Sequence, residues 1–229
     1  MGSISQVRKP PHSKTFGVEL ECYPPTRYYW GTHLWRNYGK KSEGFFEITS
    51  DMSLANGGVE FVSQPMPYVM LKKQLIVLHK RIGGWVTDSN CGLHIHVSRQ
   101  YWSAQREEKF SEFLKRLTNT QIIELFGRRA YFAEPHAYRD DKYRAVNLLH
   151  PHTYEFRLWK AGDIHWTLEA LRRTKLIVEY RGKWTYENCL ELFTKPSEEK
   201  PTTPLVNTFK QIVNPTAHPA VRRVRRQPV

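Results

Sequence analysis

Four segments of the chain alternate between apolar and polar side chains with a period of two, which predicts β-strands with one buried face. In the first segment, Val18 and Leu20 alternate with Glu19 and Glu21. Each strand therefore has an apolar face for a helix layer and a polar face directed away from it. The four segments are TFGVELECY (15–23), GGVEFVS (57–63), CGLHIHVS (91–98) and TYEFRLW (153–159).

The polar positions of these strands carry chemically reactive groups. In the fourth segment, alternation puts Leu158 on the apolar face, and Arg157 and Trp159 on the polar one. Across all four segments, the polar positions hold acidic, imidazole and guanidinium groups, namely Glu19, Glu21, Glu60, His94, His96, Glu155 and Arg157.

Such a set of side chains predicts a cation site if the strands share one sheet. For any single strand, a polar face that simply meets water is the better interpretation. Paired in one sheet, however, the carboxylates would lie close together, and their repulsion would raise their pKa values. A divalent cation removes that penalty, and oxygen ligands suit Mg²⁺ or Mn²⁺ better than Zn²⁺.

Helical periodicity separates the strands. Apolar residues recur every three to four positions over 67–82, and this pattern stops at Gly83-Gly84. A second helix is predicted over 103–126. A third begins after Asp163 as N-cap and reaches residue 180, and a shorter one covers 185–193. Strands that precede and separate helices in this irregular order predict an α+β fold.

The two ends of the chain differ from the middle. Net charge is +13, and residues 195–229 hold seven basic and two acidic groups. We expect a flexible basic N-terminal arm (1–14), a catalytic domain (15–195) and a Pro-rich basic C-terminal tail (196–229). A basic tail attracts polyanions such as nucleic acid without sequence preference. A solubilising tail is an equally good interpretation.

Composition narrows the class of protein. No segment approaches the ~20 consecutive apolar residues that a membrane-spanning helix needs. The three cysteines are odd in number and form no CxxC pair. We therefore expect a reduced, cytoplasmic protein without a membrane segment or a cysteine-based zinc site. The oligomeric state cannot be read from the sequence.

Six segments of the chain, taken in their order along the sequence, resemble the amidoligase family of the glutamine synthetase and glutamate–cysteine ligase superfamily. The resemblance implies a curved antiparallel sheet with helices on its convex face, like the glutamine synthetase catalytic domain. ATP and metal would bind on the concave face. The matching segments are GVELE (17–21), DMSLANGGVEFVSQP (51–65), NCGLHIHVS (90–98), GRR (127–129), KYRAVNLL (142–149) and HTYEFRLW (152–159).

The resemblance also implies roles for individual residues. The implied metal ligands are Glu19, Glu21, Glu60, His96 and Glu155. The implied contacts to nucleotide or substrate are Glu19, Glu21, His94, Arg128, Arg144, Asn147 and Arg157. Glu60, His96 and Arg157 would act directly in the reaction.

The implied activity is ATP-dependent joining of a carboxylate to an amine. A carboxylate is a poor electrophile, and transfer of the γ-phosphoryl group converts it into an acyl phosphate that an amine attacks. Phosphoryl transfer depends on positioning and charge neutralisation, for which metal-bound carboxylates and arginines are suited. No serine or cysteine nucleophile is needed, and we expect Cys91 to pack on the apolar face. The carboxylate and amine substrates, small molecules or peptides, are open.

Two other functions compete with this one. His94 and His96, two apart on a strand, would also suit a zinc- or iron-dependent hydrolase or oxygenase. Alternatively, the amidoligase fold would serve to bind nucleic acid or protein, because the basic tails and many aromatics would suit a partner such as single-stranded nucleic acid. The aromatic segment 28–41 is a flap over the nucleotide, a wall of the substrate site or an ordinary packed hairpin. The remaining histidines, His150 and His152 among them, show no ligand spacing and are expected in loops or at the surface.

Overall fold

The computed structural model describes residues 14–23, 41–43, 45–50, 54, 58–127 and 144–195. The predicted N-terminal arm, apart from Lys14, and the predicted C-terminal tail lie outside the described residues. So do Arg128 and nearly all of the aromatic segment 28–41. The predictions that concern those parts of the chain stay predictions.

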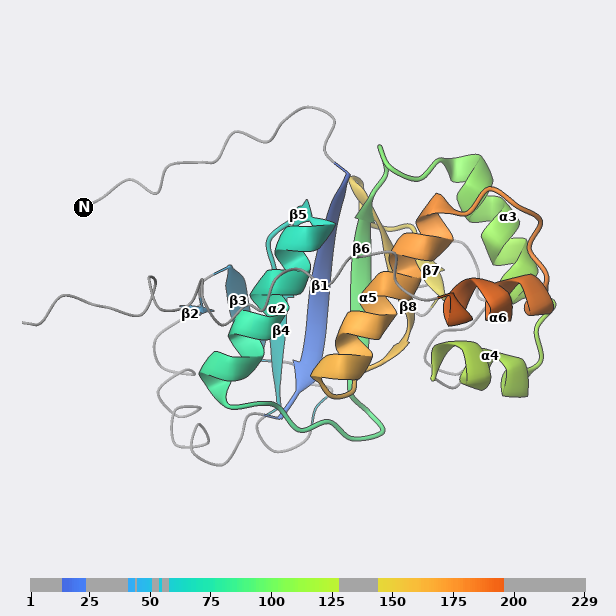
Figure 1. The fold of residues 1–229 in the computed structure, drawn as a ribbon. Helices are drawn as coiled ribbons and strands as arrows, with labels where there is room; N and C mark the ends of the chain where they lie inside the picture. Colours follow the sequence, from blue (N-terminus) through green and yellow to red (C-terminus); the bar gives the residue numbers. More distant parts are fainter. Residues whose placement is uncertain are drawn as a thin grey trace, which may run out of the picture. The chain divides into compact units, whose positions relative to one another are not determined.

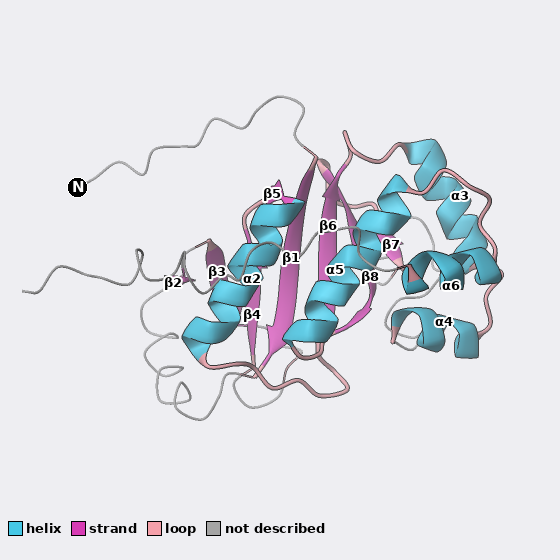
Figure 2. Ribbon diagram, in the orientation of Figure 1, coloured by secondary structure: helices cyan, strands magenta, loops and turns pink. Residues whose placement is uncertain are grey.

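An antiparallel sheet forms the centre of the fold (Figures 1 and 2). Its strand order in the described residues is β2-β3-β4-β1-β6-β8-β7, and β5 also pairs with β1. The four strands predicted from alternation are therefore consecutive neighbours, in the order β4-β1-β6-β8. The strands are β1 (Thr15–Cys22), β2 (Lys41–Glu43), β3 (Phe46–Ser50), β4 (Val59–Ser63), β5 (Met66–Pro67), β6 (Gly92–Ser98), β7 (Val146–Asn147) and β8 (Thr153–Lys160).

Two long helices lie side by side across one face of the sheet (Figure 2). These are α2 (Tyr68–Ile82) and α5 (Ile164–Glu179). The other described helices gather near β7 and β8, and they are α3 (Ala104–Leu114), α4 (Asn119–Phe126) and α6 (Tyr186–Thr194). The predicted α+β class is thus confirmed. Within the described residues, no helix is both long and apolar enough to cross a membrane.

The core lies between the sheet and these two helices. On β1, Val18 and Leu20 are 1% and 0% exposed, as the alternation predicted. Helix α2 buries Leu71, Leu75 and Leu78, which recur at helical spacing. It ends where predicted, because Gly83 has a φ of 75°, a left-handed conformation that favours glycine.

The predicted helix over 103–126 is wrong in one respect, because the structure breaks it into α3 and α4. Thr118 is the N-cap of α4, and its hydroxyl accepts a hydrogen bond from the backbone N–H of Gln121. The Gln121 side chain in turn accepts one from the backbone N–H of Thr118. This capping box starts a new helix in mid-segment.

The predicted position of Trp159 on the polar face is also wrong. Leu93 pairs with Trp159 and Ile95 with Phe156, so β8 has one more residue than β6 between these pairs. This irregularity shifts the alternation by one position. Trp159 is therefore fully buried, and its indole N–H donates to the hydroxyl of Thr174 on α5 at 2.8 Å.

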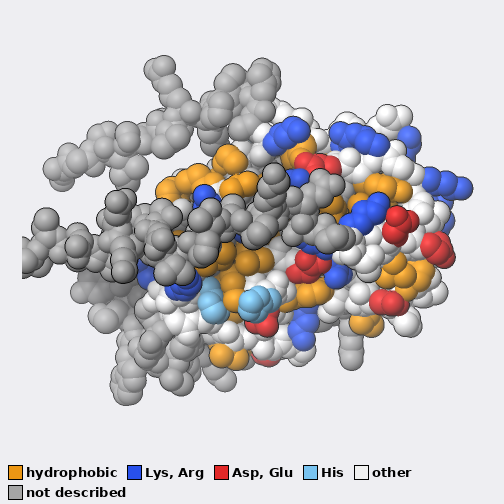
Figure 3. Space-filling model, in the orientation of Figure 1, with side chains coloured by type: hydrophobic (Ala, Val, Ile, Leu, Met, Phe, Trp, Pro, Cys, Tyr) orange, Lys and Arg blue, Asp and Glu red, His pale blue; other side chains and the backbone are white. Residues whose placement is uncertain are grey.

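The outer surface of the helix layer, on the side of the helices that faces away from the sheet, has the character of a solvated surface. Figure 3 shows Lys and Arg side chains interspersed with acidic ones there. Glu169 and Arg172 on α5, for example, are partly exposed and form an ion pair at 2.7 Å. The chemically reactive groups of β1, β6 and β8 lie elsewhere, on the polar side of the sheet.

Candidate functional site

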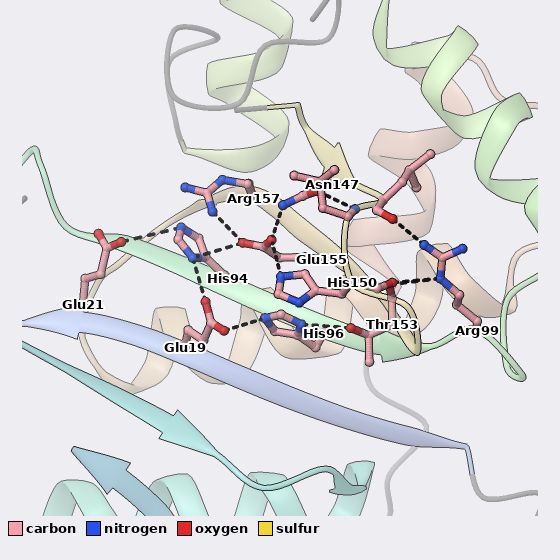
Figure 4. A network of polar contacts seen from close by, with 12 residues as sticks. Glu19, Glu21, His94, His96, Arg99, Asn147, His150, Thr153, Glu155 and Arg157 are labelled. Carbon is pink, nitrogen blue, oxygen red and sulfur yellow. Dashed lines mark hydrogen bonds and ion pairs between the residues drawn. The ribbon is translucent and has the colours of Figure 1, made fainter. Parts of the chain in front are cut away.

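Strand register gathers polar side chains from four separate segments at one place (Figure 4). Residues paired directly across antiparallel strands have side chains on the same face, with Cβ atoms about 4.5–5.5 Å apart. The predicted clustering on one face is therefore found. The directly paired residues are Glu19 with His94, Glu21 with Glu60, and His96 with Glu155.

His94 lies at the centre of the group. Its Nδ1 atom is 3.3 Å from Glu19 Oε2 and 3.3 Å from Glu155 Oε1. Its Nε2 atom is 3.7 Å from Glu21 Oε1, which is too far for a hydrogen bond. The side chain is only 3% exposed, and this Nε2 atom has no hydrogen-bond partner among the described residues. A buried polar atom without a partner is costly unless a ligand satisfies it.

Glu21 is fixed on the same side of His94. Its Oε2 atom accepts a hydrogen bond from the backbone N–H of Gly92 at 2.5 Å, and the residue is 6% exposed. Its neighbour Glu60 is less buried and accepts a hydrogen bond from the Thr49 hydroxyl at 3.1 Å. Two carboxylates and the unpartnered imidazole nitrogen thus face each other.

Glu19 and His96 form a charged pair. Glu19 Oε1 is 3.0 Å from His96 Nε2, and His96 Nδ1 is 3.2 Å from the Thr153 hydroxyl. Burial alone would raise the pKa of Glu19, but the imidazoles of His94 and His96 lower it far below its ordinary value. Burial alone would lower the pKa of His96, but nearby carboxylates, Glu19 first, raise it. The pair therefore favours carboxylate and imidazolium.

Glu155 is 1% exposed and is held by its neighbours. Its Oε1 atom accepts a hydrogen bond from Arg157 Nη1 at 2.6 Å, and its Oε2 atom accepts one from Asn147 Nδ2 at 2.6 Å. The side-chain oxygen of Asn147, Oδ1, in turn accepts a hydrogen bond from the backbone N–H of Leu149 at 2.8 Å. Asn147 thus orients Glu155, and the contact to nucleotide or substrate that the resemblance implied for Asn147 stays a prediction.

Among the described residues, three groups of side chains have the composition of a metal site. In each group, one ligand atom per residue lies within 4.8 Å of the others. Mixed carboxylate and imidazole ligands suit divalent cations. Together with the unpartnered His94 Nε2, this donor set fits the predicted cation. The groups are Glu21–Glu60–His94, Glu19–His94–Glu155 and His96–His150–Glu155.

Arg144 forms an ion pair with a residue of helix α3. Its Nη2 atom is 3.2 Å from the carboxylate of Glu107 on α3, which also accepts a hydrogen bond from the Ser111 hydroxyl at 2.6 Å. Glu107 is 5% exposed, so an unpaired charge there would be unfavourable. Arg144 therefore neutralises a buried carboxylate on α3, and the contact to phosphate or substrate that the resemblance implied for it stays a prediction.

His150 is a site residue that the sequence analysis missed. Its Nε2 atom is 3.2 Å from Glu155 Oε2, and its ring packs edge to face on His96 with 5.0 Å between centroids. It lies between β7 and β8, where strand alternation gives no information. The only available signal was its position three residues before a strand that carries site residues.

Cys91 is not suited to act as a nucleophile. It is 1% exposed, and burial raises the pKa of its thiol to about 12. The thiolate is the reactive form of cysteine, so a thiol that stays protonated at neutral pH is inert. The expected packing position agrees with this environment.

No protein-family model matches the chain, and neither a curated protein nor a solved structure matches it. Roles for the site residues therefore come from the chemistry of their own side chains.

Proposed function

We propose that this protein is an ATP- and divalent-cation-dependent ligase that joins a carboxylate to an amine. One observation carries the proposal: four carboxylates and two strand histidines from separate segments converge beside Arg157 on one face of the sheet. The resemblance to amidoligases, with their glutamine-synthetase-like curved sheet, supplies the reaction class. A small-molecule or peptide carboxylate and an amine are the proposed substrates.

The excess of negative charge supports the cation. The four carboxylates are Glu19, Glu21, Glu60 and Glu155, and Arg157 is the guanidinium hydrogen-bonded to this group among the described residues. These carboxylates, with His96 and His94, would hold Mg²⁺ or Mn²⁺. When bound, the cation would neutralise charge on the phosphoryl oxygens of ATP.

The chain's own residues would then position the reactants. A guanidinium has five N–H donors, so Arg157 can contact a phosphate oxygen while it holds Glu155. The γ-phosphoryl group would pass to the substrate carboxylate, and ADP would leave. The amine nitrogen would attack the acyl carbon, and phosphate would leave. A carboxylate of the site would accept the amine's proton.

A metal-dependent hydrolase is the second candidate, and a specific observation favours it. Three imidazoles, those of His94, His96 and His150, lie within these carboxylate groups. Several imidazoles suit zinc or iron better than magnesium. Tight binding of zinc or iron without affinity for ATP would favour the hydrolase.

Nucleotide binding in the presence of Mg²⁺ tests the ligase proposal. We expect Glu19→Gln and Arg157→Ala each to weaken ATP binding at least about tenfold, or ~1.4 kcal/mol. Matched controls are Glu112→Gln and Arg116→Ala on and after α3, where both side chains are exposed. Equal ATP affinity in the parent and all four variants would contradict the proposed roles.

A further inference from the structure

His150 is placed against two site residues although it comes from a connection between strands. Its Nε2 atom is 3.2 Å from Glu155 Oε2. Its ring packs edge to face against the ring of His96, with 5.0 Å between the ring centroids. Its side chain is 46% exposed, whereas Glu155 is almost fully buried. His150 therefore stands at the solvent-facing rim of the group shown in Figure 4.

The backbone around His150 is anchored from a different strand end. Arg99, which follows β6, donates from Nη2 to the carbonyl of Leu148 at 2.5 Å and from Nε to the carbonyl of His150 at 3.1 Å. The same Nε atom is 3.3 Å from the carbonyl of Thr153. An anchored backbone lowers the entropy cost of holding an exposed side chain in a binding geometry.

The spacing of these groups suits metal coordination. Ligands about 2.0–2.1 Å from a tetrahedral zinc ion are about 3.3 Å apart. The 3.2 Å between His150 Nε2 and Glu155 Oε2 is close to that separation. Asn147 and Arg157 hold the same carboxylate, as outer partners commonly do for metal ligands.

The donor set differs from that on the other side of the site. His96, His150 and Glu155 offer two imidazoles and one carboxylate, whereas the group around Glu21 and Glu60 offers one imidazole and two carboxylates. Two imidazoles and a carboxylate select transition metals, and oxygen-rich sets select Mg²⁺.

We propose that His96, His150 and Glu155 form an outer metal subsite that prefers a transition-metal dication, of the Zn²⁺ and Co²⁺ class, over Mg²⁺. This inference deepens the proposed function, because it divides the proposed cation ligands into an inner group around Glu21 and Glu60 and an outer group that contains His96 and Glu155. It rests on the proposed function only for the cation of the inner group. His150 closes the outer subsite at the solvent side and supplies its most accessible ligand.

Cobalt is the probe, because its visible absorption reports the coordination of the bound ion directly. The full chain, freed of metal with a chelator, is titrated with Co²⁺ in the presence of millimolar Mg²⁺. We expect saturable absorption bands in the parent and at least tenfold weaker Co²⁺ binding in His150→Gln. The matched control is His152→Gln, two residues away, whose side chain is exposed. It should bind like the parent.

Co²⁺ binding and ATP binding test the outer subsite and the ligase proposal separately. Unchanged Co²⁺ affinity in His150→Gln, or displacement of Co²⁺ by Mg²⁺, would overturn the outer subsite. Mg²⁺-dependent ATP binding, measured on the same proteins, reports the ligase proposal separately. Loss of Co²⁺ binding in His150→Gln with native circular dichroism would support the subsite, even if no protein bound ATP.

Discussion

Two clusters of charged side chains in this protein differ in their balance of acidic and basic groups. On α5, Glu169 accepts hydrogen bonds from Arg172 and Arg173, both at 2.7 Å. On the sheet, four carboxylates converge from β1, β4 and β8, and in the described part of the chain the guanidinium of Arg157 is bonded to one of them. The helix cluster joins near neighbours in sequence, whereas the sheet cluster joins residues up to 136 positions apart (19 to 155).

The side chains of the helix cluster form hydrogen bonds that hold helices together. Arg172 also donates to the carbonyl of Phe193 on α6 at 2.5 Å, and Arg173 donates to that of Leu125 on α4 at 2.8 Å. One carboxylate thus orients two arginines that connect three helices. In the sheet cluster, by contrast, the Nε2 atom of His94 is buried without a hydrogen bond in the described part of the chain.

The difference separates charges that stabilise the fold from charges that we propose bind a cation. A matched cluster gains stability from its ion pairs, although exposed pairs contribute little each. A crowded acidic cluster gains stability when a cation binds the folded chain and not the unfolded one. The two clusters should therefore respond in opposite ways to divalent cations and to the removal of one carboxylate.

Cation binding should have the largest effect. At a Mn²⁺ concentration one hundred times the dissociation constant, the free energy of unfolding should rise by about 2.7 kcal/mol. Denaturant unfolding with Mn²⁺ and with a chelator measures this difference. The variant Glu169→Gln should show the same rise as the parent. No rise in the parent would mean that the sheet cluster does not hold a divalent cation.

Removing the helix carboxylate should have a smaller effect. Without divalent cations, Glu169→Gln should lower the free energy of unfolding by about 1 kcal/mol, because both arginines lose their charged partner. Under the same conditions, Glu21→Gln should lower it by less than about 0.5 kcal/mol, or raise it. Gln keeps an oxygen for the Gly92 N–H and removes one crowded charge. A large loss in Glu21→Gln with none in Glu169→Gln would invert the comparison.

The smallest effect concerns pH. Burial opposes ionisation of Glu169, but Arg172 and Arg173 outweigh it and lower its pKa below the ordinary 4.5. Its contribution to stability is therefore complete above pH 4.5 and is lost as the pH falls through the lowered pKa. The stability difference between the parent and Glu169→Gln should shrink over that range. A difference that stayed constant down to pH 3 would argue against an ionic contribution.

Strand alternation predicted much of this site. A period of two fixed which face carries Glu19, Glu21 and His94, and an antiparallel sheet then made them neighbours. The same rule failed for Trp159, because an extra residue in β8 shifts the alternation and no local signal announces such a bulge.

Long-range pairings were harder to predict. Arg144 was expected near phosphate, but its partner Glu107 is 37 positions earlier, on a helix whose placement the sequence pattern does not specify. His150 was missed because its position depends on Arg99, 51 positions away, which holds the backbone between β7 and β8. The break between α3 and α4, in contrast, was predictable from the capping box of Thr118 and Gln121.

Paramagnetic resonance of Mn²⁺ tests most directly whether the sheet cluster is a cation site. The signal of free Mn²⁺ should fall as chelator-treated protein is added, with saturation at a defined stoichiometry. Glu21→Gln should bind Mn²⁺ at least about tenfold more weakly, whereas Glu169→Gln should match the parent. A free Mn²⁺ signal that the parent does not reduce, or that all three proteins reduce equally, would contradict the account.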